Sequence, residues 1–288
     1  MLEHDTSPWP NRELSRFVAA GGIRWHVQQC GGGPSLLLLH GTGASTHSWR
    51  ELLPILAREH AVTAIDLPGH ALTDLVNPAQ CSIGGMSGLI GALLRELNVQ
   101  PRCCVGHSAG AVILCRMALD GHIAPRRLIS INGAFAPLTG AAGLLYSPIA
   151  KLLSHSPFLS RLIARRAGDP ANVARVIAGT GSSLDRAGVE HYARLLSNPR
   201  HVEGVLRMMA NWDLRSFESD LQRLSTPLAM LVAENDLTVP PHQAQRVREI
   251  VADAAVHRLP GVGHLAHEEQ PELVAQEILK ICRASGPC

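Results

Sequence analysis

The sequence predicts an α/β protein with a mostly parallel, eight-stranded sheet that is flanked by helices and carries an inserted helical cap. Short apolar runs alternate with amphipathic stretches from residue 15 to about residue 132. The alternation stops between about 135 and 216 and then resumes. A glycine-rich strand-to-helix junction lies at residues 106–110. Alternation of this kind is typical of a parallel sheet with helices on both faces.

The elements before the interruption follow from runs of apolar residues. Ser15–Ala20 and Ile23–Gln29 form a predicted hairpin, because Gly21-Gly22 between them supplies a tight turn. Apolar runs without polar alternation predict strands buried on both faces. These runs are Ser35–His40, Ala61–Asp66, Cys103–Val105 and Leu128–Asn132. We expect helices over roughly Thr46–Arg58, Ile83–Leu97 and Ala111–Leu119.

The interruption itself has helical but no strong strand patterns, and several prolines divide it. The short helical patterns are Ser160–Arg166, Ala171–Ala178, Arg186–Leu196 and Val202–Asn211. The chain then returns to strand, helix, strand and helix, with the ranges Pro227–Ala233, Pro241–Val251, Ala255–Leu259 and Glu268–Arg283. The sequence therefore predicts a core formed by residues 1–134 and 217–288 and a cap formed by residues 135–216.

Composition excludes several classes of function. The net charge of +2 is too small to indicate nucleic-acid binding, and no apolar run is long enough to span a bilayer. The polar start with two prolines indicates neither a signal peptide nor a membrane anchor. Seven cysteines without regular spacing are typical of reduced thiols, so a cytoplasmic protein is expected. His264 and His267 lack a third neighbouring ligand, and neither a metal nor a cofactor is predicted.

Ser108 is the candidate nucleophile. It lies between Gly106 and Gly110 in the run Gly-His-Ser-Ala-Gly, after an apolar strand and before a helix. Glycines permit a turn this sharp, and the turn would present the serine hydroxyl above the sheet. A short string of this kind also occurs by chance, so its meaning depends on finding a base, an acid and an oxyanion hole elsewhere.

The base and the acid are expected in two later loops. A serine hydroxyl needs a base to accept its proton, and His264 follows the last predicted strand in the run Leu259-Pro-Gly-Val-Gly-His264. Asp236 follows the preceding strand, where it would orient the imidazole. Glu234 is the local alternative to Asp236. Taken alone, His264 would be a surface histidine and Asp236 a helix N-cap.

The oxyanion hole is predicted from two backbone amides. Ala109 begins the helix after Ser108, and Thr42 lies between Gly41 and Gly43 after the strand 35–40. An ordinary glycine-rich turn is the alternative interpretation of residues 40–43. We expect His40 to brace this turn.

The substrate pocket is less well defined by the sequence. His107, Trp49, Met208 and Trp212 are candidates to line it, and packing in the core is the alternative for each. Asp213 is either an ion-pair partner or a substrate contact.

These motifs together resemble the α/β-hydrolases, and the resemblance runs from about residue 15 to the end. A narrower resemblance is to the magnesium-chelatase accessory proteins of bacteriochlorophyll biosynthesis. It rests most distinctively on Trp9-Pro-Asn-Arg12, and also on Ser15–Phe17, Gly22–His26, His40–Trp49, Asp66–His70, Gly106–Gly110, Asn211–Asp213 and Gly263–Glu268. The resemblance implies a cytoplasmic protein of a phototrophic bacterium that acts on or near tetrapyrrole intermediates. It also implies magnesium-chelatase subunits as partners.

Three functions stay open at this point. The first is acyl hydrolysis of an apolar small-molecule substrate, which the resemblance suggests to be a tetrapyrrole. The second is tetrapyrrole binding or assistance to the chelatase on a hydrolase scaffold that does not turn over. The third is a general carboxylesterase or a carbon–carbon bond hydrolase. The chain lacks a phosphate-binding G-x-x-x-x-G-K-[ST] loop, so it is not predicted to be the motor of the chelatase.

Overall fold

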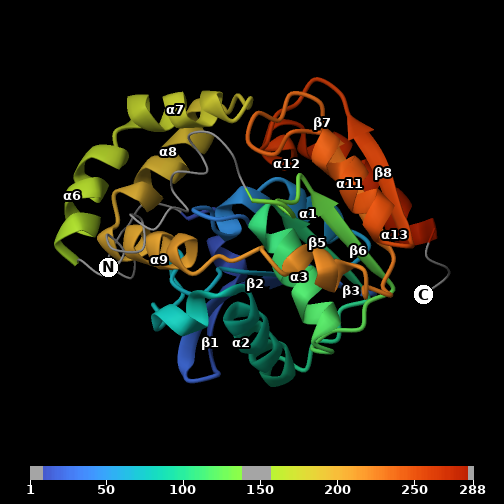
Figure 1. Ribbon diagram of the computed structural model, residues 1–288. Coiled ribbons are helices and arrows are strands. Elements are labelled where there is room, and N and C mark those ends of the chain that lie inside the picture. The colour runs from blue at the N-terminus through green and yellow to red at the C-terminus, as the bar shows by residue number, and fades with distance from the viewer. Residues whose placement is uncertain (1–8, 138–156, 285–288) are drawn as a thin grey trace.

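The computed structural model describes residues 9–137 and 157–284 and contains a single eight-stranded sheet (Figure 1). The strand order is β1-β2-β4-β3-β5-β6-β7-β8. The first two strands pair antiparallel, β2 pairs antiparallel with β4, and the remaining neighbours are parallel. The strands are β1 Ser15–Ala20, β2 Ile23–Cys30, β3 Ser35–Leu39, β4 Ala61–Ile65, β5 Cys103–His107, β6 Arg127–Ile131, β7 Leu228–Ala233 and β8 Ala254–Leu259. The predicted mostly parallel sheet is confirmed.

Strand periodicity divides the core into two layers, one on each face of the sheet. In β3, Leu37 and Leu39 belong to one apolar cluster, whereas Leu36 and Leu38 belong to the other. Alternate side chains of a strand point to opposite faces, so a fully apolar strand serves both layers. Helices α2 (Ile83–Glu96), α3 (Ala109–Leu119), α10 (Phe217–Leu221) and α11 (His242–Ile250) contribute to the first cluster, and α1 (Leu52–Leu56) and α13 (Pro271–Ala284) to the second.

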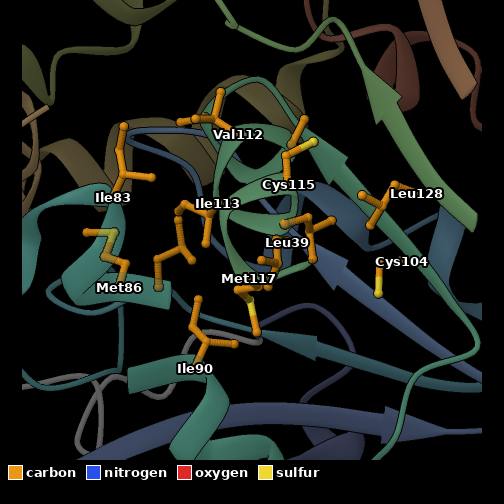
Figure 2. Packing of buried hydrophobic residues seen from close by; sticks show 14 of the residues in the cluster. Leu39, Ile83, Met86, Ile90, Cys104, Val112, Ile113, Cys115, Met117 and Leu128 are labelled. Atoms are coloured by element: carbon orange, nitrogen blue, oxygen red, sulfur yellow. The ribbon is translucent and has the colours of Figure 1, made fainter. Parts of the chain in front are cut away.

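Helix α3 lies at the centre of the first cluster (Figure 2). Its Val112, Ile113 and Met117 are fully buried, and they pack with α2 residues such as Ile90 and with Leu39 of the sheet. Burying side chains of this size stabilises the fold by about 1.5–3 kcal/mol each. The packing fixes the helix that begins directly after Ser108.

Among the described residues, four helices lie within the predicted insertion, between β6 and α10; we call them the cap helices. They are α6 Pro157–Ala167, α7 Pro170–Gly179, α8 Arg186–Leu196 and α9 Pro199–Ala210. Asp169, Asp185 and Asn198 cap the last three through side-chain hydrogen bonds to backbone N–H groups. Residues 138–156 of the predicted insertion lie outside the described residues.

Two of the predicted helices are wrong as single elements. Residues 46–58 form a 3-10 turn, Thr46–Trp49, and a separate α1, while residues 268–283 are divided between α12 (Ala266–Glu269) and α13. Proline explains both divisions, since its ring blocks the hydrogen bond to the carbonyl four residues earlier. Pro54 lies in the first turn of α1 and Pro271 begins α13, where no N–H group is needed.

Candidate functional site

Ser108 occupies the turn between β5 and α3 with φ 50° and ψ −115°. This region is costly for any residue with a Cβ, by about 1–3 kcal/mol. Backbone hydrogen bonds hold it there: the Ser108 N–H donates to Ile131 O at 3.0 Å, and Ser108 O accepts from Ala111 N at 3.2 Å and Ala134 N at 3.3 Å. The predicted sharp turn is therefore present, and its strain is imposed by the surrounding strands.

The two glycines flanking Ser108 are required by close backbone contacts. A Cβ on Gly106 would overlap the backbone of Ala111, and a Cβ on Gly110 would overlap the carbonyl oxygen of Leu39. Helix α3 can approach β5 this closely only because Gly106 has no side chain, and it can approach β3 this closely only because Gly110 has none.

The two later loops bring His264 and Asp236 together. The Nδ1 of His264 lies 2.8 Å from Oδ2 of Asp236, and both side chains are buried. The other carboxylate oxygen, Oδ1, accepts from the N–H groups of Thr238 and Val239, each at 2.8 Å. Asp236 thus fixes its own loop while it orients the imidazole with Nδ1–H donating and Nε2 left free. The alternative acid, Glu234, is exposed.

The backbone of His264 is held from two sides. Its carbonyl oxygen accepts from Nδ2 of Asn132 at 2.9 Å and from Nε2 of His107 at 2.9 Å. Its N–H donates to the carbonyl oxygen of Thr180, which precedes α8. Asn132 also donates to Gly263 O, and its Oδ1 accepts from Ala233 N at 2.8 Å.

Asn132 is a site residue that the sequence reasoning missed. It was placed only as the last residue of a strand, although a polar side chain at the carboxyl end of a buried parallel strand was the available signal. Its φ of 47° is a further feature that the sequence did not indicate.

The glycine-rich turn after β3, residues 40–43, lies against the sharp turn at residues 106–110, which we call the elbow. A Cβ on Gly41 would lie 3.1 Å from the Cβ of Ser108. His40 braces this turn as predicted: its Nδ1 donates to Gly41 O at 2.8 Å and its Nε2 accepts from Leu67 N at 2.9 Å. Burial lowers the pKa of His40 and favours this neutral, bridging form. Thr42 and Ala109, the predicted oxyanion donors, therefore belong to segments that flank Ser108.

Cap helix α9 contacts this same turn. The hydroxyl of Thr42 lies 3.7 Å from Sδ of Met208, and the ring of His201 is hydrogen-bonded to Gly43 O at 3.2 Å. Met208, one of the pocket candidates, is thus next to the predicted oxyanion segment as well as part of the core cluster.

The other pocket candidates are placed differently. Trp49 is fully buried in the cluster beneath α1 and α13, and its ring is 4.6 Å from that of His267, which favours the core-packing alternative. Trp212 is half-buried and packs against the α3 cluster. The ring of His107 lies between those of His264 and His267, at 4.7 and 4.5 Å. Asp213 forms an exposed ion pair with Arg215.

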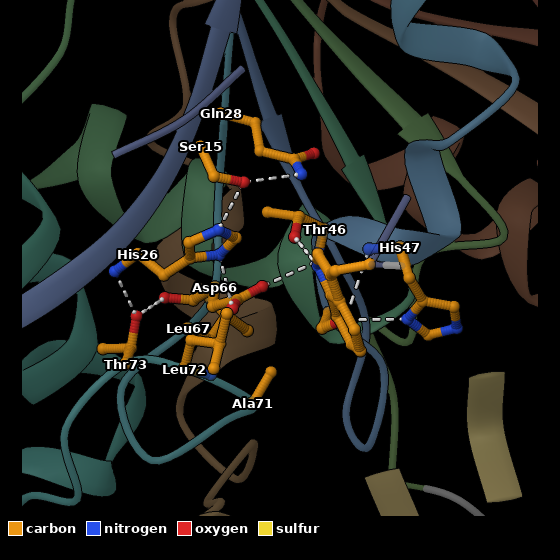
Figure 3. A network of polar contacts seen from close by, with 12 residues as sticks. Ser15, His26, Gln28, Thr46, His47, Asp66, Leu67, Ala71, Leu72 and Thr73 are labelled. Carbon is orange, nitrogen blue, oxygen red and sulfur yellow. Dashed lines mark hydrogen bonds and ion pairs between the residues drawn. The ribbon is translucent and has the colours of Figure 1, made fainter. Parts of the chain in front are cut away.

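Ser15, His26 and Asp66 form a hydrogen-bonded Ser–His–Asp array elsewhere in the core (Figure 3). Nδ1 of His26 is 2.8 Å from Asp66 Oδ2, and Nε2 is 2.9 Å from the hydroxyl of Ser15. Burial opposes ionisation of Asp66, but the His26 ring and the Thr46 N–H outweigh it and hold the pKa of this carboxyl well below its ordinary value. Ser15 begins the edge strand β1 with an extended backbone and also accepts from Gln28 Nε2 at 3.2 Å. This array ties β1, β2 and the loops after β3 and β4 together.

The distinctive Trp9-Pro-Asn-Arg12 segment packs at the junction of the core and α8. The Trp9 ring is buried and lies 5.9 Å from His47 and 6.4 Å from His191 of α8. Asn11 donates through Nδ2 to the carbonyl oxygen of Arg50 at 3.1 Å. In the structure, this segment joins the loop after β3 to cap helix α8.

Within residues 9–137 and 157–284, no group of three or more His, Cys, Asp or Glu side chains is arranged to hold a metal ion. Over the same ranges, no helix has both the length and the apolar character that crossing a bilayer requires.

The sequence model of the "Alpha/beta hydrolase family" matches residues 36–277, which span the elbow, both loops and the cap helices. The chain belongs to the α/β-hydrolase family. Its fold agrees: the crystal structure of an α/β-hydrolase fold protein from Burkholderia ambifaria is 26% identical, with a TM-score of 0.78 over 93% of this chain and 97% of that one. The epoxide hydrolase CorEH has the same fold, with a TM-score of 0.78 at 20% identity over 92% of this chain and 97% of that one.

A relative with a more specific name confirms the narrower resemblance. The chain is 35% identical over 262 residues to the "Magnesium-chelatase 30 kDa subunit" of Rhodobacter capsulatus, and the match covers 90% of this chain and 91% of the relative. This α/β-hydrolase is therefore similar along most of its length to a protein named for magnesium chelatase.

Proposed function

We propose that this chain is a serine hydrolase in which Ser108 is the nucleophile, His264 the general base and Asp236 the residue that orients the base. The observation that carries the proposal is the backbone of Ser108, held at φ 50° at the start of a helix. Strain of this kind persists only where surrounding structure enforces it, and it clusters at functional sites. The buried His264–Asp236 hydrogen bond and the contact between the elbow and the Gly41 turn support the same assignment.

In this mechanism, Nε2 of His264 takes the proton of the Ser108 hydroxyl while the oxygen attacks a carbonyl carbon. A bond forms between Ser108 Oγ and the carbonyl carbon, and the π electrons of the carbonyl move to its oxygen. The negative oxygen of this tetrahedral intermediate is stabilised by the backbone amides of Ala109 and Thr42. The protonated His264 then gives its proton to the leaving group, which departs. Water, deprotonated by His264, attacks the acyl-enzyme and releases the acid and free Ser108.

Ser108 is favoured over Ser15 as the nucleophile, although Ser15 also lies within hydrogen-bond distance of a histidine that is paired with an aspartate. Ser108 precedes helix α3, whose first two N–H groups, those of Ala109 and Gly110, have no carbonyl acceptor within the helix and can stabilise an anion, whereas Ser15 is the first residue of β1 and is paired with β2. The hydroxyl of Ser15 is also engaged by Gln28. Ser15→Ala is therefore a matched control for Ser108→Ala.

The test is covalent labelling with a fluorophosphonate, followed by peptide mapping and by turnover of p-nitrophenyl esters. We expect one label per chain on Ser108, and Ser108→Ala should abolish labelling and lower turnover by roughly a thousandfold or more. Ser15→Ala should label at the unaltered rate. A label on Ser15, or an unlabelled protein with no ester turnover, contradicts the proposal.

We further propose that the physiological substrate is an apolar small molecule of the tetrapyrrole class, hydrolysed in the cytoplasm near the magnesium-chelatase step. The similarity to a chelatase-named relative over 90% of the chain supports this assignment, as does the Trp9-Pro-Asn-Arg12 segment. The cysteines of the described residues are free thiols, in keeping with a reducing compartment.

A non-catalytic role in binding a tetrapyrrole or assisting the chelatase is favoured only by the name of that relative. Complementation separates the two roles. In a bacteriochlorophyll-producing strain lacking this protein, Ser108→Ala should accumulate normally and fail to restore pigment, while Ser15→Ala should restore it. Full restoration by Ser108→Ala would assign the chain to the binding role.

A further inference from the structure

The turn between α7 and α8, residues 180–183, contacts both loops that carry the proposed base and acid; we call it the cap turn. It belongs to the inserted cap helices in sequence, yet the end of α7 lies beside the loops that follow β7 and β8 (Figure 1). None of its residues carries a chemical role in the mechanism above.

A single carbonyl oxygen of the cap turn joins the two loops. Thr180 O accepts from the N–H of Leu237, one residue after Asp236, at 3.1 Å. The same oxygen accepts from the N–H of His264 itself at 3.4 Å. A shift of Thr180 would therefore move the acid and the base relative to each other.

Ser182 holds the residue after the base. Its hydroxyl oxygen accepts from the N–H of Leu265 at 2.8 Å, and the side chain is 4% exposed. Its neighbour Ser183 is exposed and contributes only its backbone N–H, which donates to Glu269 Oε2 at 3.2 Å. The other oxygen of Glu269 accepts from Gly263 N at 2.8 Å, so the loop before the base is tied to the same turn.

Two glycines allow the three segments to meet backbone to backbone. A Cβ on Gly181, whose φ is 83°, would overlap Asn235 O, and a Cβ on Gly263 would overlap Gly181 O. Side chains at these positions would separate the cap turn from the acid and base loops. By contrast, Gly179 at the end of α7 faces open space.

His264 is consequently fixed by two different parts of the fold. The core holds its carbonyl oxygen through Asn132 and His107, and the cap turn holds its N–H. We infer that the cap turn is a positioning element of the catalytic centre and that Ser182, through Leu265, is a positioning residue for His264. The expected effect on labelling and turnover rests on the proposed function. The effect of the cap turn on the position of His264 does not depend on turnover.

The experiment compares Ser182→Ala with Ser183→Ala, which removes the same hydroxyl from the adjacent, exposed position. Two quantities are measured well below the unfolding temperature: the rate of fluorophosphonate labelling, and the NMR signal of the His264 Nδ1–H shared with Asp236. Ser182→Ala leaves the Leu265 N–H without its acceptor, so the base loop should shift. We expect labelling and kcat to fall about tenfold with KM little changed, and the Nδ1–H signal to shift or broaden. Ser183→Ala should match the unaltered protein in both quantities.

A second pair of variants covers the case in which Ser182→Ala folds poorly. Gly181→Ala should weaken labelling and the Nδ1–H signal, whereas Gly179→Ala should change neither. A purely structural role predicts a lower unfolding temperature with an unchanged labelling rate and an unchanged signal, and that result overturns the inference. If the unaltered protein never labels, the proposed function fails, and the Nδ1–H signal alone then decides the positioning role.

Discussion

Asn132 shows how one side chain can connect several strands of the site. Its amide donates to Gly263 O and His264 O and accepts from Ala233 N, while its own backbone has φ 47°. Asparagine tolerates this region better than most residues, and few other side chains both donate and accept at one planar group. The residue therefore combines a backbone requirement with a hydrogen-bonding one.

Asn132→Asp tests this directly, because it keeps the size and the backbone tolerance but replaces two donors by an acceptor. A carboxylate facing two carbonyl oxygens in a buried site should lower the free energy of unfolding by about 2–4 kcal/mol. Labelling of Ser108 should slow as well. Asn98→Asp is the control, since Asn98 has φ 51° but is exposed, and it should stay within ~0.5 kcal/mol. Urea unfolding measures both, and equal effects would contradict the assigned role.

At the scale of elements, the elbow depends on how closely α3 approaches β3 and β5. The carbonyl oxygen of Leu39 fills the space where a Cβ on Gly110 would lie. By comparison, Gly88 in α2 has open space around its Cα. Two glycines within helices of the same layer thus have opposite structural requirements.

Gly110→Ala should therefore displace the first turn of α3, lowering the free energy of unfolding by roughly 1–3 kcal/mol or more and slowing Ser108 labelling. Gly88→Ala should instead raise the free energy of unfolding by about 0.5–1 kcal/mol, because alanine costs less conformational entropy in a helix. Denaturant unfolding of the two variants checks both signs. A stabilised Gly110→Ala would show that the close approach is not needed.

The element scale also shows what pattern reading could predict. Strands made of unbroken apolar residues were predictable, and so were the cap helices, because each of these elements has its own local pattern in the sequence. The sequence pattern does not show the divisions of 46–58 and 268–283, because the helical patterns continue across the first turn of α1, which contains Pro54, and across Pro271, which begins α13. The prolines were visible, but only the packing shows on which side of each proline the helix continues.

At the scale of the whole molecule, the unusual feature is the number of buried imidazoles. Among the imidazoles that are at most 3% exposed, burial lowers the pKa of six, to about 4 for His201 and about 3 for His267. The others are His40, His47, His70 and His107. All six are at most 3% exposed, so the folded protein holds them neutral.

These groups predict that stability falls as pH drops below about 6.5, the ordinary pKa of histidine. The unfolded chain then binds protons that the folded chain cannot, which costs about 1.4 kcal/mol per pH unit for each imidazole. Burial raises the pKa of Glu268 to about 7, partly offset by Arg50, and this carboxyl acts in the opposite sense. Because one carboxyl acts against six imidazoles, the free energy of unfolding still decreases as the pH falls. Calorimetry should show Tm falling steeply between pH 7 and 5, and Glu268→Gln should steepen the fall. A constant Tm would contradict the prediction.

The sequence by itself determined the strands, most of the helices, their order and the segments that supply Ser108, His264 and Asp236. Each follows from local information: apolar periodicity, glycines at a sharp turn, and a polar residue directly after a buried strand. Residues that are adjacent in the chain impose these features, so they can be predicted without the tertiary structure.

Only the tertiary structure decided which segments meet. Asp236 rather than Glu234 is hydrogen-bonded to His264, and Trp49 lies in the core. Asn132 and the cap turn hold the backbone of His264, although Asn132 is more than a hundred positions away along the chain. The order of strands in the sheet creates these contacts. Their energies come from burial and hydrogen bonding between distant segments, for which no local pattern exists.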